Sequence, residues 1–426
     1  MGRPWKSLER FALRCCTLWR LCGEAKPRWS TSSWTIRTSC SPDSDRAPGK
    51  GKGGEVMSDI PRTSRAAVLV DYNKPVEIRE IEIPPLEPGA ILVKVEAATI
   101  CGTDVHISHG KLTQFSKVPL VPGHEIVGRI VTLGEGRERD AADRPLRLGD
   151  RIIWAYPWCG QCYYCTIARQ PTLCPNARMY GWGPCNEPPY LTGGFSEYVY
   201  VRPRCQVVKA PEELDARVVA SATCAFRTIV HGFERLGGLG IQDSVLILGC
   251  GPVGLYAMAM ALVSGAAQTI IVGAPRRRLA LAEKWGATHT INIEEVTAAE
   301  ERKKLILDLT EGRGPDVVIE CAGPSVAFKE GLEVIRRGGR FLVIGQTDST
   351  PVSIVPSLIN LRNIEIIGVL SASVPHFYKA MQFLENNQQR FSFTDLISNT
   401  YRLEEANVAL KSMEQLQEIK PAILPS

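Results

Sequence analysis

The sequence contains no run of 18 or more consecutive apolar residues, which excludes a transmembrane helix of the usual length. It also lacks an apolar signal segment and an even scatter of cysteines, so neither secretion nor a disulfide framework is indicated. Strong charge is absent as well, because residues 57–426 hold 39 Lys and Arg against 40 Asp and Glu. A neutral body indicates no nucleic-acid partner. What is present is an ordinary globular composition, 44% apolar over 426 residues, with room for two or three domains.

The first 56 residues differ from the rest of the chain. They carry 11 Lys and Arg against five Asp and Glu, include four of the eight Trp, and show no helical or strand period. An Arg- and Ser-rich, acid-poor segment resembles a mitochondrial transit peptide, whereas the ordinary start MSDIPRTS at Met57 favours translated upstream sequence. We favour the second interpretation and expect a disordered extension on a cytoplasmic protein, with mitochondrial targeting as the alternative.

Two patterns of apolar and turn residues follow each other along the remaining chain. Strand-like runs separated by turn residues fill 65–100 and recur at 126–133 and 148–155, which predicts a barrel-like antiparallel β domain. From about residue 240 the apolar runs VLILG, TIIVG, VVIEC and FLVIG alternate with helical segments such as LYAMAMALVSG. Short buried strands that alternate with helices predict a doubly wound parallel sheet of the α/β class.

A cluster of cysteines is the strongest single motif. Two residues separate Cys159 from Cys162 and Cys162 from Cys165, and Cys174 follows. This spacing lets four thiolates close a tetrahedral shell around zinc, and a closed shell leaves no position for a substrate. The pattern therefore predicts a structural zinc. The alternative, four free buried cysteines, would require four to gather within sixteen residues by accident.

A glycine-rich turn ends one of the apolar strands, in VLILGCGPVGL. A G-x-G-x-x-G pattern between a strand and a helix allows a tight turn and presents the helix amides to a pyrophosphate. We therefore predict a dinucleotide site whose backbone contacts come from Gly249, Gly251, Pro252, Val253 and Gly254.

The end of the next apolar strand bears on which dinucleotide binds. An NAD site usually places an acid there to bond the ribose, but this chain has Gly273 followed by Arg276, Arg277 and Arg278. Without the acid a 2′-phosphate meets no repulsion, and a guanidinium can bind it with two hydrogen bonds. NADP(H) is therefore predicted, with Arg277 and Arg278 as ligands. The alternatives are NAD and an ordinary solvated helix start.

Potential metal ligands also lie near residue 100, in CGTDVHISHG and PGHEIVG. Cys101 and His124 alone are weak evidence for a metal site. Together with the two motifs above, their order resembles the zinc-dependent medium-chain alcohol dehydrogenase family over about residues 60–424. The matching motifs are Cys-Gly-Thr-Asp at 101–104, Gly-His-Glu at 123–125, Gly-Asp-Arg at 149–151, the cysteine cluster, Gly-Gly-Phe-Ser-Glu-Tyr at 193–198 and the glycine-rich turn.

The resemblance implies a catalytic zinc bound by Cys101, His124 and Cys224, with Glu125 behind the metal as an exchanging ligand. Two thiolates and an imidazole leave one position open for water or a substrate oxygen. A cysteine at 224 resembles alcohol dehydrogenases, whereas polyol dehydrogenases of the family tend to place a carboxylate there.

The resemblance assigns roles to smaller groups too. It implies that Thr103 takes the substrate proton and His106 relays it to solvent, while Asp104 orients the ligand histidine and Thr228 contacts the nicotinamide. We interpret His109 as a surface residue.

The implied architecture is a GroES-like β-barrel catalytic domain over 60–235, carrying the zinc lobe at 159–174. A Rossmann domain follows over 236–372, and residues 373–426 return to the catalytic domain. The implied activity is reversible hydride transfer between an alcohol and a nicotinamide cofactor, with two zinc ions per chain. The partners implied are a small alcohol or carbonyl substrate and further copies of the chain, as a homodimer or homotetramer, but no membrane.

The chain departs from the family at the eight-residue last gap of the cysteine cluster, at Gly273, and in two long loops, 135–150 and 182–194. The loops prevent a substrate from being carried over. A zinc-dependent polyol or amino-alcohol dehydrogenase is therefore the first alternative. A non-enzymatic NADP-binding protein is the second, and it is disfavoured because all the zinc ligands are present.

Overall fold

The computed structural model describes residues 60–345 and 350–425, so the predictions for residues 1–56 lie outside the described part of the chain. The first strands of that part, β1 (Thr63–Val68) and β2 (Glu77–Glu82), form an antiparallel pair. A larger sheet follows with the order β14–β15–β3–β4–β5–β7, and β6 also pairs with β3. Its strands are β3 (Ile91–Thr99), β4 (Glu125–Leu133), β5 (Arg151–Trp154), β6 (Tyr198–Val201), β7 (Val207–Lys209), β14 (Ile397–Arg402) and β15 (Lys420–Leu424).

The last strand of the chain completes this larger sheet. β15 pairs antiparallel with β3, placing Ala422 opposite Thr99. Its residues Lys420–Ile423 are buried, which is unusual for a segment that begins with a lysine. The C-terminal segment is therefore part of the core that surrounds the start of β4.

The second of the two large sheets has six parallel strands in the order β10–β9–β8–β11–β12–β13. Counted along the chain, this is the order 3-2-1-4-5-6 of a dinucleotide-binding fold. The strands are β8 (Ser244–Leu248), β9 (Gln268–Gly273), β10 (His289–Asn292), β11 (Val317–Glu320), β12 (Arg340–Val343) and β13 (Glu365–Gly368).

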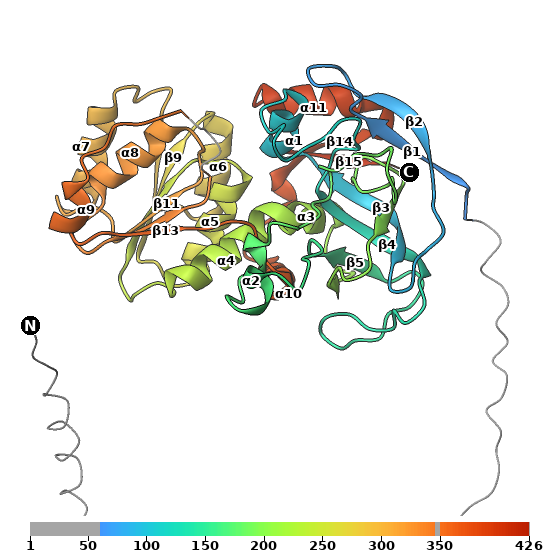
Figure 1. Ribbon diagram of the computed structural model, residues 1–426. Helices are drawn as coiled ribbons and strands as arrows, with labels where there is room; N and C mark the ends of the chain where they lie inside the picture. Colours follow the sequence, from blue (N-terminus) through green and yellow to red (C-terminus); the bar gives the residue numbers. More distant parts are fainter. Residues whose placement is uncertain (1–59, 346–349, 426) are drawn as a thin grey trace, which may run out of the picture. The chain divides into compact units, whose positions relative to one another are not determined.

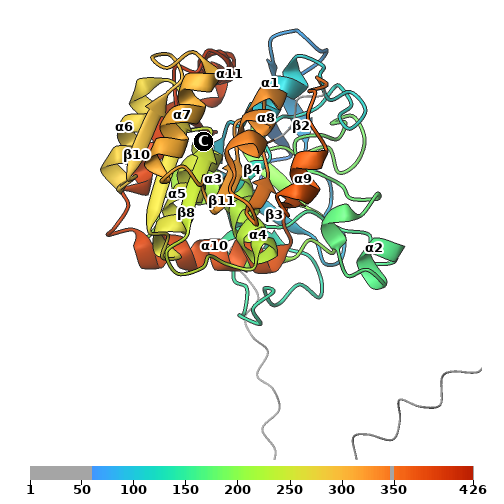
Figure 2. The same ribbon diagram turned by 90° about the vertical axis from the view of Figure 1, so that its left-hand side faces the viewer.

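Helices cover both faces of the parallel sheet (Figures 1 and 2). One apolar core joins the strands to α4 (Arg227–Leu236), α5 (Pro252–Val263) and α6 (Arg276–Trp285). A second core joins the other side chains of the same strands to α7 (Ala299–Leu309) and α8 (Ser325–Val334). Because the inner strands β8, β9, β11 and β12 are buried on both faces, they are nearly continuous apolar runs, as their sequences predicted.

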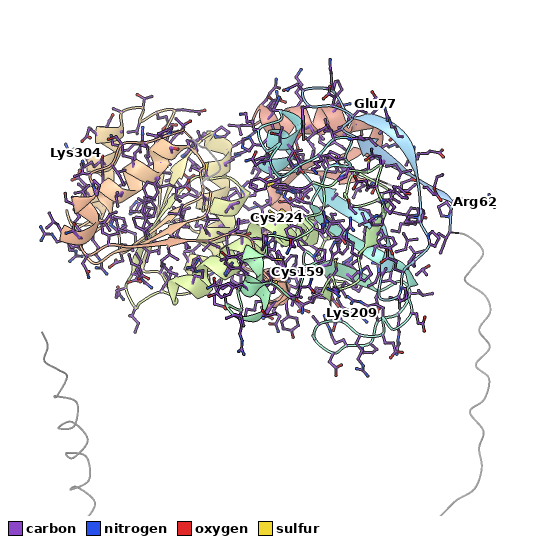
Figure 3. All side chains as sticks on the ribbon, viewed as in Figure 1. Arg62, Glu77, Cys159, Lys209, Cys224 and Lys304 are labelled. Atoms are coloured by element: carbon purple, nitrogen blue, oxygen red, sulfur yellow. The ribbon has the colours of Figure 1, made fainter. Side chains whose placement is uncertain are left out.

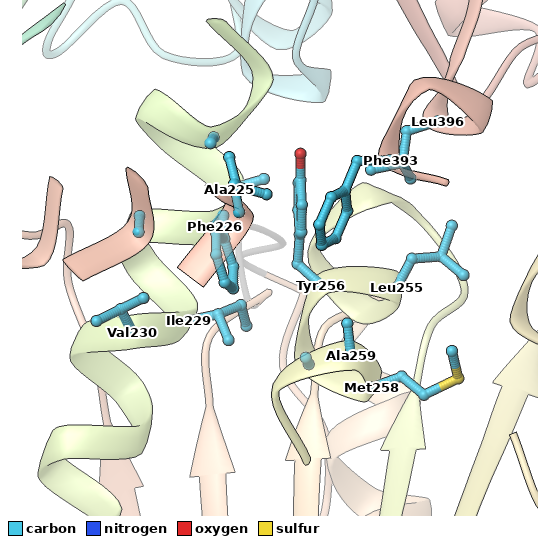
Figure 4. Close-up of a cluster of buried hydrophobic side chains, with 14 of the residues drawn as sticks. Ala225, Phe226, Ile229, Val230, Leu255, Tyr256, Met258, Ala259, Phe393 and Leu396 are labelled. Atoms are coloured by element: carbon cyan, nitrogen blue, oxygen red, sulfur yellow. The ribbon is translucent and has the colours of Figure 1, made fainter. Parts of the chain in front are cut away.

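A cluster of aromatic and aliphatic side chains connects the two sheets (Figure 4). Phe226 stacks on Tyr256 of α5 with ring centroids 4.7 Å apart, and Phe393 of η3 (Phe393–Leu396) approaches Tyr256 at 6.1 Å. This packing fixes the turn that precedes α4 against the nucleotide-binding sheet.

The remaining elements connect these parts. They are α1 (Gly102–Ser108), α2 (Tyr163–Thr166), η1 (Pro171–Leu173), α3 (Ala216–Ser221), η2 (Ala222–Phe226), α9 (Ser357–Leu361), α10 (Val374–Asn387), η4 (Leu403–Glu405) and α11 (Ala406–Glu414). Among the described residues, none of the helices has the length and apolar character needed to cross a membrane.

Candidate metal centres and cofactor site

Three separate elements bring the predicted catalytic ligands together. Cys101 ends the stretch after β3 and caps α1, His124 immediately precedes β4, and Cys224 lies at the centre of η2, a π-helical turn. Their ligand atoms and a carboxylate oxygen of Glu125 all lie within 4.8 Å of one another. Single π-helical turns are rare and are concentrated at functional sites. Figure 3 shows Cys224 at this turn.

Asp104 holds the orientation of two of these ligands. It is 1% exposed, and its Oδ1 accepts a hydrogen bond from His124 Nδ1 at 3.1 Å and from the Gly123 amide at 3.2 Å. Its other oxygen accepts from the Cys101 amide at 2.8 Å. With Nδ1 engaged, His124 has Nε2 left for a metal, which is the usual carboxylate–histidine–metal arrangement.

A buried ion pair lies behind the ligands. Both oxygens of Glu125 contact the ammonium of Lys420, at 2.7 and 2.5 Å, and the Thr99 hydroxyl donates to the same carboxylate. Burial raises the pKa of Glu125 to about 7, although the ammonium opposes this shift. Burial also disfavours the charged Lys420, but the adjacent carboxylate outweighs it and raises the pKa of the lysine.

The two thiols of the cluster are electrostatically unequal. The hydrogen bond from Cys224 holds the pKa of Cys101 well below its usual value, and the same contact, together with burial, raises the pKa of Cys224. Two sulfurs and one imidazole that converge in a buried site, with one thiol already acidified, form a donor set suited to zinc with one position left over. The residues therefore fit the predicted metal.

The predicted proton-transfer residues lie on α1. The Thr103 hydroxyl is 3.6 Å from Cys101 Sγ, and His106 is half-buried one turn further on. Burial lowers the pKa of His106, so its imidazole is neutral near pH 7 and able to accept a proton. His109 contacts Glu414 at 2.8 Å and is 37% exposed, consistent with a surface position.

The second cysteine cluster is local and more exposed. The Cys162 sulfur lies 3.6 Å from that of Cys165 and 3.8 Å from that of Cys174, and all four ligand sulfurs, Cys159 included, lie within 4.8 Å of one another. Backbone amides, chiefly that of Gln161, lower the pKa of Cys159 to about 6. Four cysteines without a disulfide fit a closed tetrahedral zinc shell.

The glycine-rich turn needs glycine at two of its positions. Gly249 has φ +107°, and a Cβ there would lie 2.7 Å from the Ala322 amide nitrogen. A Cβ on Gly254 would lie 1.8 Å from Gly249 O, so only glycine permits this approach of helix to strand. Gly251 is the N-cap of α5, Pro252 is its first residue, and Val253 is half-buried.

Packing explains why the strand ends in Gly273 rather than in the acid of an NAD site. A Cβ at this position would lie 2.5 Å from Cys250 Sγ, so no side chain, acidic or otherwise, can replace the glycine without a shift. An acid nevertheless lies in the neighbourhood, because the charge of Glu294 acts on Cys250. Glu294 follows Ile293, whose amide bonds to the Gly273 carbonyl at 3.2 Å.

The arginines after Gly273 have protein partners. Arg276 pairs with Glu283 at 3.0 Å, and the guanidinium of Arg277 donates to the Leu416 carbonyl. Arg278 is 5% exposed, donates to Glu418 O at 2.6 Å, and keeps its second terminal nitrogen 3.9 Å from the Cβ position of Gly251. Of the three, Arg278 thus lies against the glycine-rich turn.

The first turn of α4 contributes another predicted contact. The Thr228 hydroxyl donates to the Cys224 carbonyl at 2.7 Å, which ties the predicted nicotinamide contact to the π-helical turn.

Sequence reasoning missed several supporting residues. Lys420 stands in the otherwise apolar run IKPAIL, and a lysine at this place in the sequence indicates a buried partner. Arg227 is 2% exposed and donates to Thr223 O and Ser371 Oγ, and it too stands between apolar residues, in AFRTIV. The Thr223 hydroxyl, which accepts from the Ile126 amide at 3.2 Å, could not be found from pattern alone.

Comparisons with known proteins agree with the observed fold. The alcohol dehydrogenase GroES-like domain model matches residues 87–212, and the zinc-binding dehydrogenase model matches residues 252–386. The 5-exo-hydroxycamphor dehydrogenase of Pseudomonas putida is 33% identical over 84% of this chain and 98% of its own length. The chain belongs to the zinc-dependent alcohol dehydrogenase family. The predicted family and fold class, a GroES-like β domain plus a Rossmann sheet, are confirmed.

Two further relatives show how broad this alcohol dehydrogenase family is. An alcohol dehydrogenase structure from Thermotoga maritima superposes with a TM-score of 0.80 at 35% identity, covering 85% of this chain and all of that one. The sorbitol dehydrogenase of Bacillus subtilis is 29% identical over 84% of this chain and 96% of its own length. Alcohol dehydrogenase-type oxidoreductase function with zinc and a nicotinamide cofactor is therefore shown for the chain, while the names of its relatives span several substrates.

Proposed function

We propose that this dehydrogenase transforms its alcohol or carbonyl substrate at a zinc held by Cys101, His124 and Cys224. The observation that carries the proposal is their convergence from the end of β3, the start of β4 and η2 within 4.8 Å. When bound there, zinc supplies a Lewis acid for the substrate oxygen, and the nicotinamide supplies the hydride acceptor.

The chain's own residues prepare the site and move the proton. Asp104 fixes His124, and the burial of both excludes water from that side of the cluster. The Thr103 hydroxyl lies close enough to the Cys101 sulfur to bond a substrate hydroxyl at the open position, and His106, held neutral, accepts the proton and passes it toward solvent.

Glu125 acts as a reserve carboxylate rather than a permanent ligand. Its oxygens are occupied by Lys420 and Thr99, so exchange with a metal ligand would require that ion pair to loosen. The cysteine lobe holds a second, structural zinc, because four thiolates leave no open position.

We propose NADP(H) as the preferred cofactor. No acid stands at position 273, and the Arg278 guanidinium adjoins the glycine-rich turn, which together favour an additional phosphate over a free ribose hydroxyl. Glu294 and the engagement of Arg277 by the Leu416 carbonyl work in the opposite direction and support NAD as the alternative. Initial rates with NADP⁺ and NAD⁺ decide between them, and equal or better kcat/KM with NAD⁺ would reject the preference.

Assembly and location stay predictions. Family resemblance implies a homodimer or homotetramer, which sedimentation equilibrium checks, and a cytoplasmic location, which localisation of a tagged full-length chain checks.

The decisive experiment replaces one ligand of the catalytic cluster. We expect Cys224→Ala to retain one zinc per chain instead of two and to lose alcohol turnover by at least about a thousandfold, while the far-ultraviolet circular dichroism stays unchanged. Cys185→Ser serves as the matched control, because Cys185 is a half-buried cysteine outside both clusters. Retained turnover in Cys224→Ala would reject the ligand assignment.

A polyol or amino-alcohol dehydrogenase is the second candidate. The similarity to sorbitol dehydrogenase favours it, whereas a cysteine at 224 favours simple alcohols. A rate panel of primary, secondary, cyclic and aromatic alcohols against polyols and threonine separates the two, since activity confined to polyols or threonine would favour the second candidate.

A further inference from the structure

A groove of about 710 Å³ has one wall tied to a predicted zinc ligand. A Cβ on Gly181 would lie 2.8 Å from the Gly123 carbonyl oxygen, so these two backbones are in contact, and His124 follows Gly123 directly. The residue after Gly181 is Trp182, which lines the groove. The groove therefore begins one residue away from the segment that carries the ligand histidine.

The other wall is tied to the segment that carries Cys224. Leu370 lines the groove, and the next residue, Ser371, accepts a hydrogen bond from Arg227 at 2.8 Å. Arg227 in turn bonds the carbonyl of Thr223, the residue before the ligand cysteine. Two lining residues, Trp182 and Leu370, are thus each one residue away from a contact with the segment that carries His124 or Cys224, and the lining also includes Cys174 of the lobe cluster.

Exposed apolar side chains cover much of the groove. Phe115 is 65% exposed and packs edge-on against Trp182 with ring centroids 6.2 Å apart, and Leu370 is 55% exposed. Met179 adds a flexible apolar side chain to the lining. Large apolar groups gathered in one concave place are typical of a ligand-binding surface.

The same groove carries uncompensated positive charge. Lys117, Arg178 and Arg202 line it against one acid, Glu187. Within the described residues none of the three cations has a side-chain ion pair, whereas elsewhere on the β domain Arg151 pairs with Glu96. Unpaired cations over an apolar floor attract an anion and strengthen its binding because apolar walls exclude water.

We propose that this groove binds the non-reacting end of the substrate, and that the substrate is an alcohol or ketone with an apolar, ring-bearing body and a carboxylate at its far end. The oxygen to be oxidised lies at the zinc cluster, the ring packs on Phe115, Trp182 and Leu370, and the carboxylate meets Arg178, Arg202 and Lys117. This inference rests on the proposed function, since it names the substrate class of the same site.

The first test compares acids with their neutral esters on the zinc-replete full-length enzyme. Benzyl alcohol, para-hydroxymethyl phenylacetate, its one-carbon-longer homologue and the methyl ester of each acid are assayed with saturating cofactor. We expect kcat/KM for the better acid to exceed that of its ester about tenfold, because a hydrogen-bonded charge contact contributes roughly that factor. We also expect this preference to decline as salt is raised.

The second test removes the charges individually. The acid-to-ester ratio of kcat/KM should fall about tenfold in Arg178→Gln or Arg202→Gln, or in both. Lys411→Gln is the matched control, because Lys411 is an exposed cation that lines a different cavity. The control should keep the wild-type ratio, which separates a local contact from the effect of net charge.

The outcomes distinguish this inference from the proposed function. If alcohols are oxidised but esters match or exceed acids, the carboxylate proposal is overturned and the dehydrogenase proposal stands. If no alcohol is oxidised, calorimetric binding of phenylbutyrate tests the groove alone. Binding that weakens about tenfold in Arg178→Gln or Arg202→Gln supports an anion groove, and no binding to the wild-type chain overturns it.

Discussion

The two metal clusters of this chain are built in opposite ways. The lobe cluster gathers four cysteines from residues 159–174 on a short helix and its flanking turns, where most of the intervening residues are exposed but the cysteines are half-buried or, for Cys174, buried. The catalytic cluster takes one ligand from each of three distant segments, and the side chain of its histidine is 3% exposed. A local cluster needs only its own loop, whereas the distant one depends on the cores of both sheets and on the buried residues Asp104, Lys420 and Thr223.

The largest expected effect comes from the buried ion pair behind the catalytic cluster. Lys420→Met leaves the Glu125 carboxylate buried without its partner, so we expect a loss of about 3–5 kcal/mol in the free energy of unfolding, measured in urea. Lys284→Met is the control, because Lys284 pairs with Asp395 at 2.6 Å on the surface and should cost at most about 1 kcal/mol. Equal losses in the two variants would contradict a structural role for the buried pair.

The next largest effect is expected from residues that hold the metal ligands in place, which should matter more in the catalytic cluster than in the lobe. Asp104→Asn weakens the acceptor that orients His124, so we expect zinc affinity at the catalytic cluster to fall about 10- to 100-fold in a chelator competition. In the lobe, the Asn176 amide reaches Cys159 Sγ only at 3.8 Å, and Asn176→Ala should weaken zinc binding much less. A larger loss of zinc affinity in Asn176→Ala than in Asp104→Asn would contradict this expectation.

Loss of a lobe thiolate should release the structural zinc and leave turnover intact, whereas loss of Cys224 should release the catalytic zinc and abolish turnover. Cys165→Ser should release the lobe zinc and make residues 160–173 sensitive to trypsin, because this segment has little core of its own. The catalytic zinc should stay bound, as seen in a metal content of one per chain with retained turnover. Loss of both ions would show that the two clusters are not independent.

The smallest expected effect is a pH dependence where the lobe meets α4 and α10. His376 is 6% exposed, and its ring lies 4.5 Å from that of His231, with Glu234 and Lys379 alongside. Burial, then the charge of His231, lowers its pKa to about 4. The unfolded chain therefore binds the proton more readily, so this contribution to stability is complete above about pH 6.5 and is lost as pH falls toward 4.

We expect His376→Gln to flatten the fall of the melting temperature between pH 6.5 and pH 4. His289→Gln, in the edge strand β10, should keep the wild-type profile. Identical profiles for all three proteins would rule out a contribution from His376.

Much of this molecule could be predicted from the sequence. The predictable features depend on residues that are close together in the sequence, and the others depend on contacts between distant segments. The buried parallel strands β8, β9, β11 and β12 are apolar runs, and the lobe has metal spacing within sixteen residues. The edge strands β10 (HTIN) and β13 (EIIG) carry too few apolar residues to stand out.

The catalytic cluster was harder to predict. Cys224 could be proposed only by resemblance to a family, because no local spacing connects it to Cys101, and the π-helical turn that presents it has no sequence signature. The position of Lys420 follows from the pairing of the C-terminal strand β15 with β3, two segments far apart in the sequence. The hydrogen bonds of Arg277 and Arg278 to the carbonyls of Leu416 and Glu418 likewise join distant segments, so no local pattern predicts them.

The most direct test of the central claim is a crystal structure of the zinc-replete enzyme with anomalous data collected at the zinc edge. Two anomalous peaks per chain are expected, one among the four lobe cysteines and one about 2.3 Å from the sulfurs of Cys101 and Cys224 and about 2.1 Å from His124 Nε2. A single peak in the lobe, or a second peak that does not contact Cys224, would contradict the assignment of the catalytic metal.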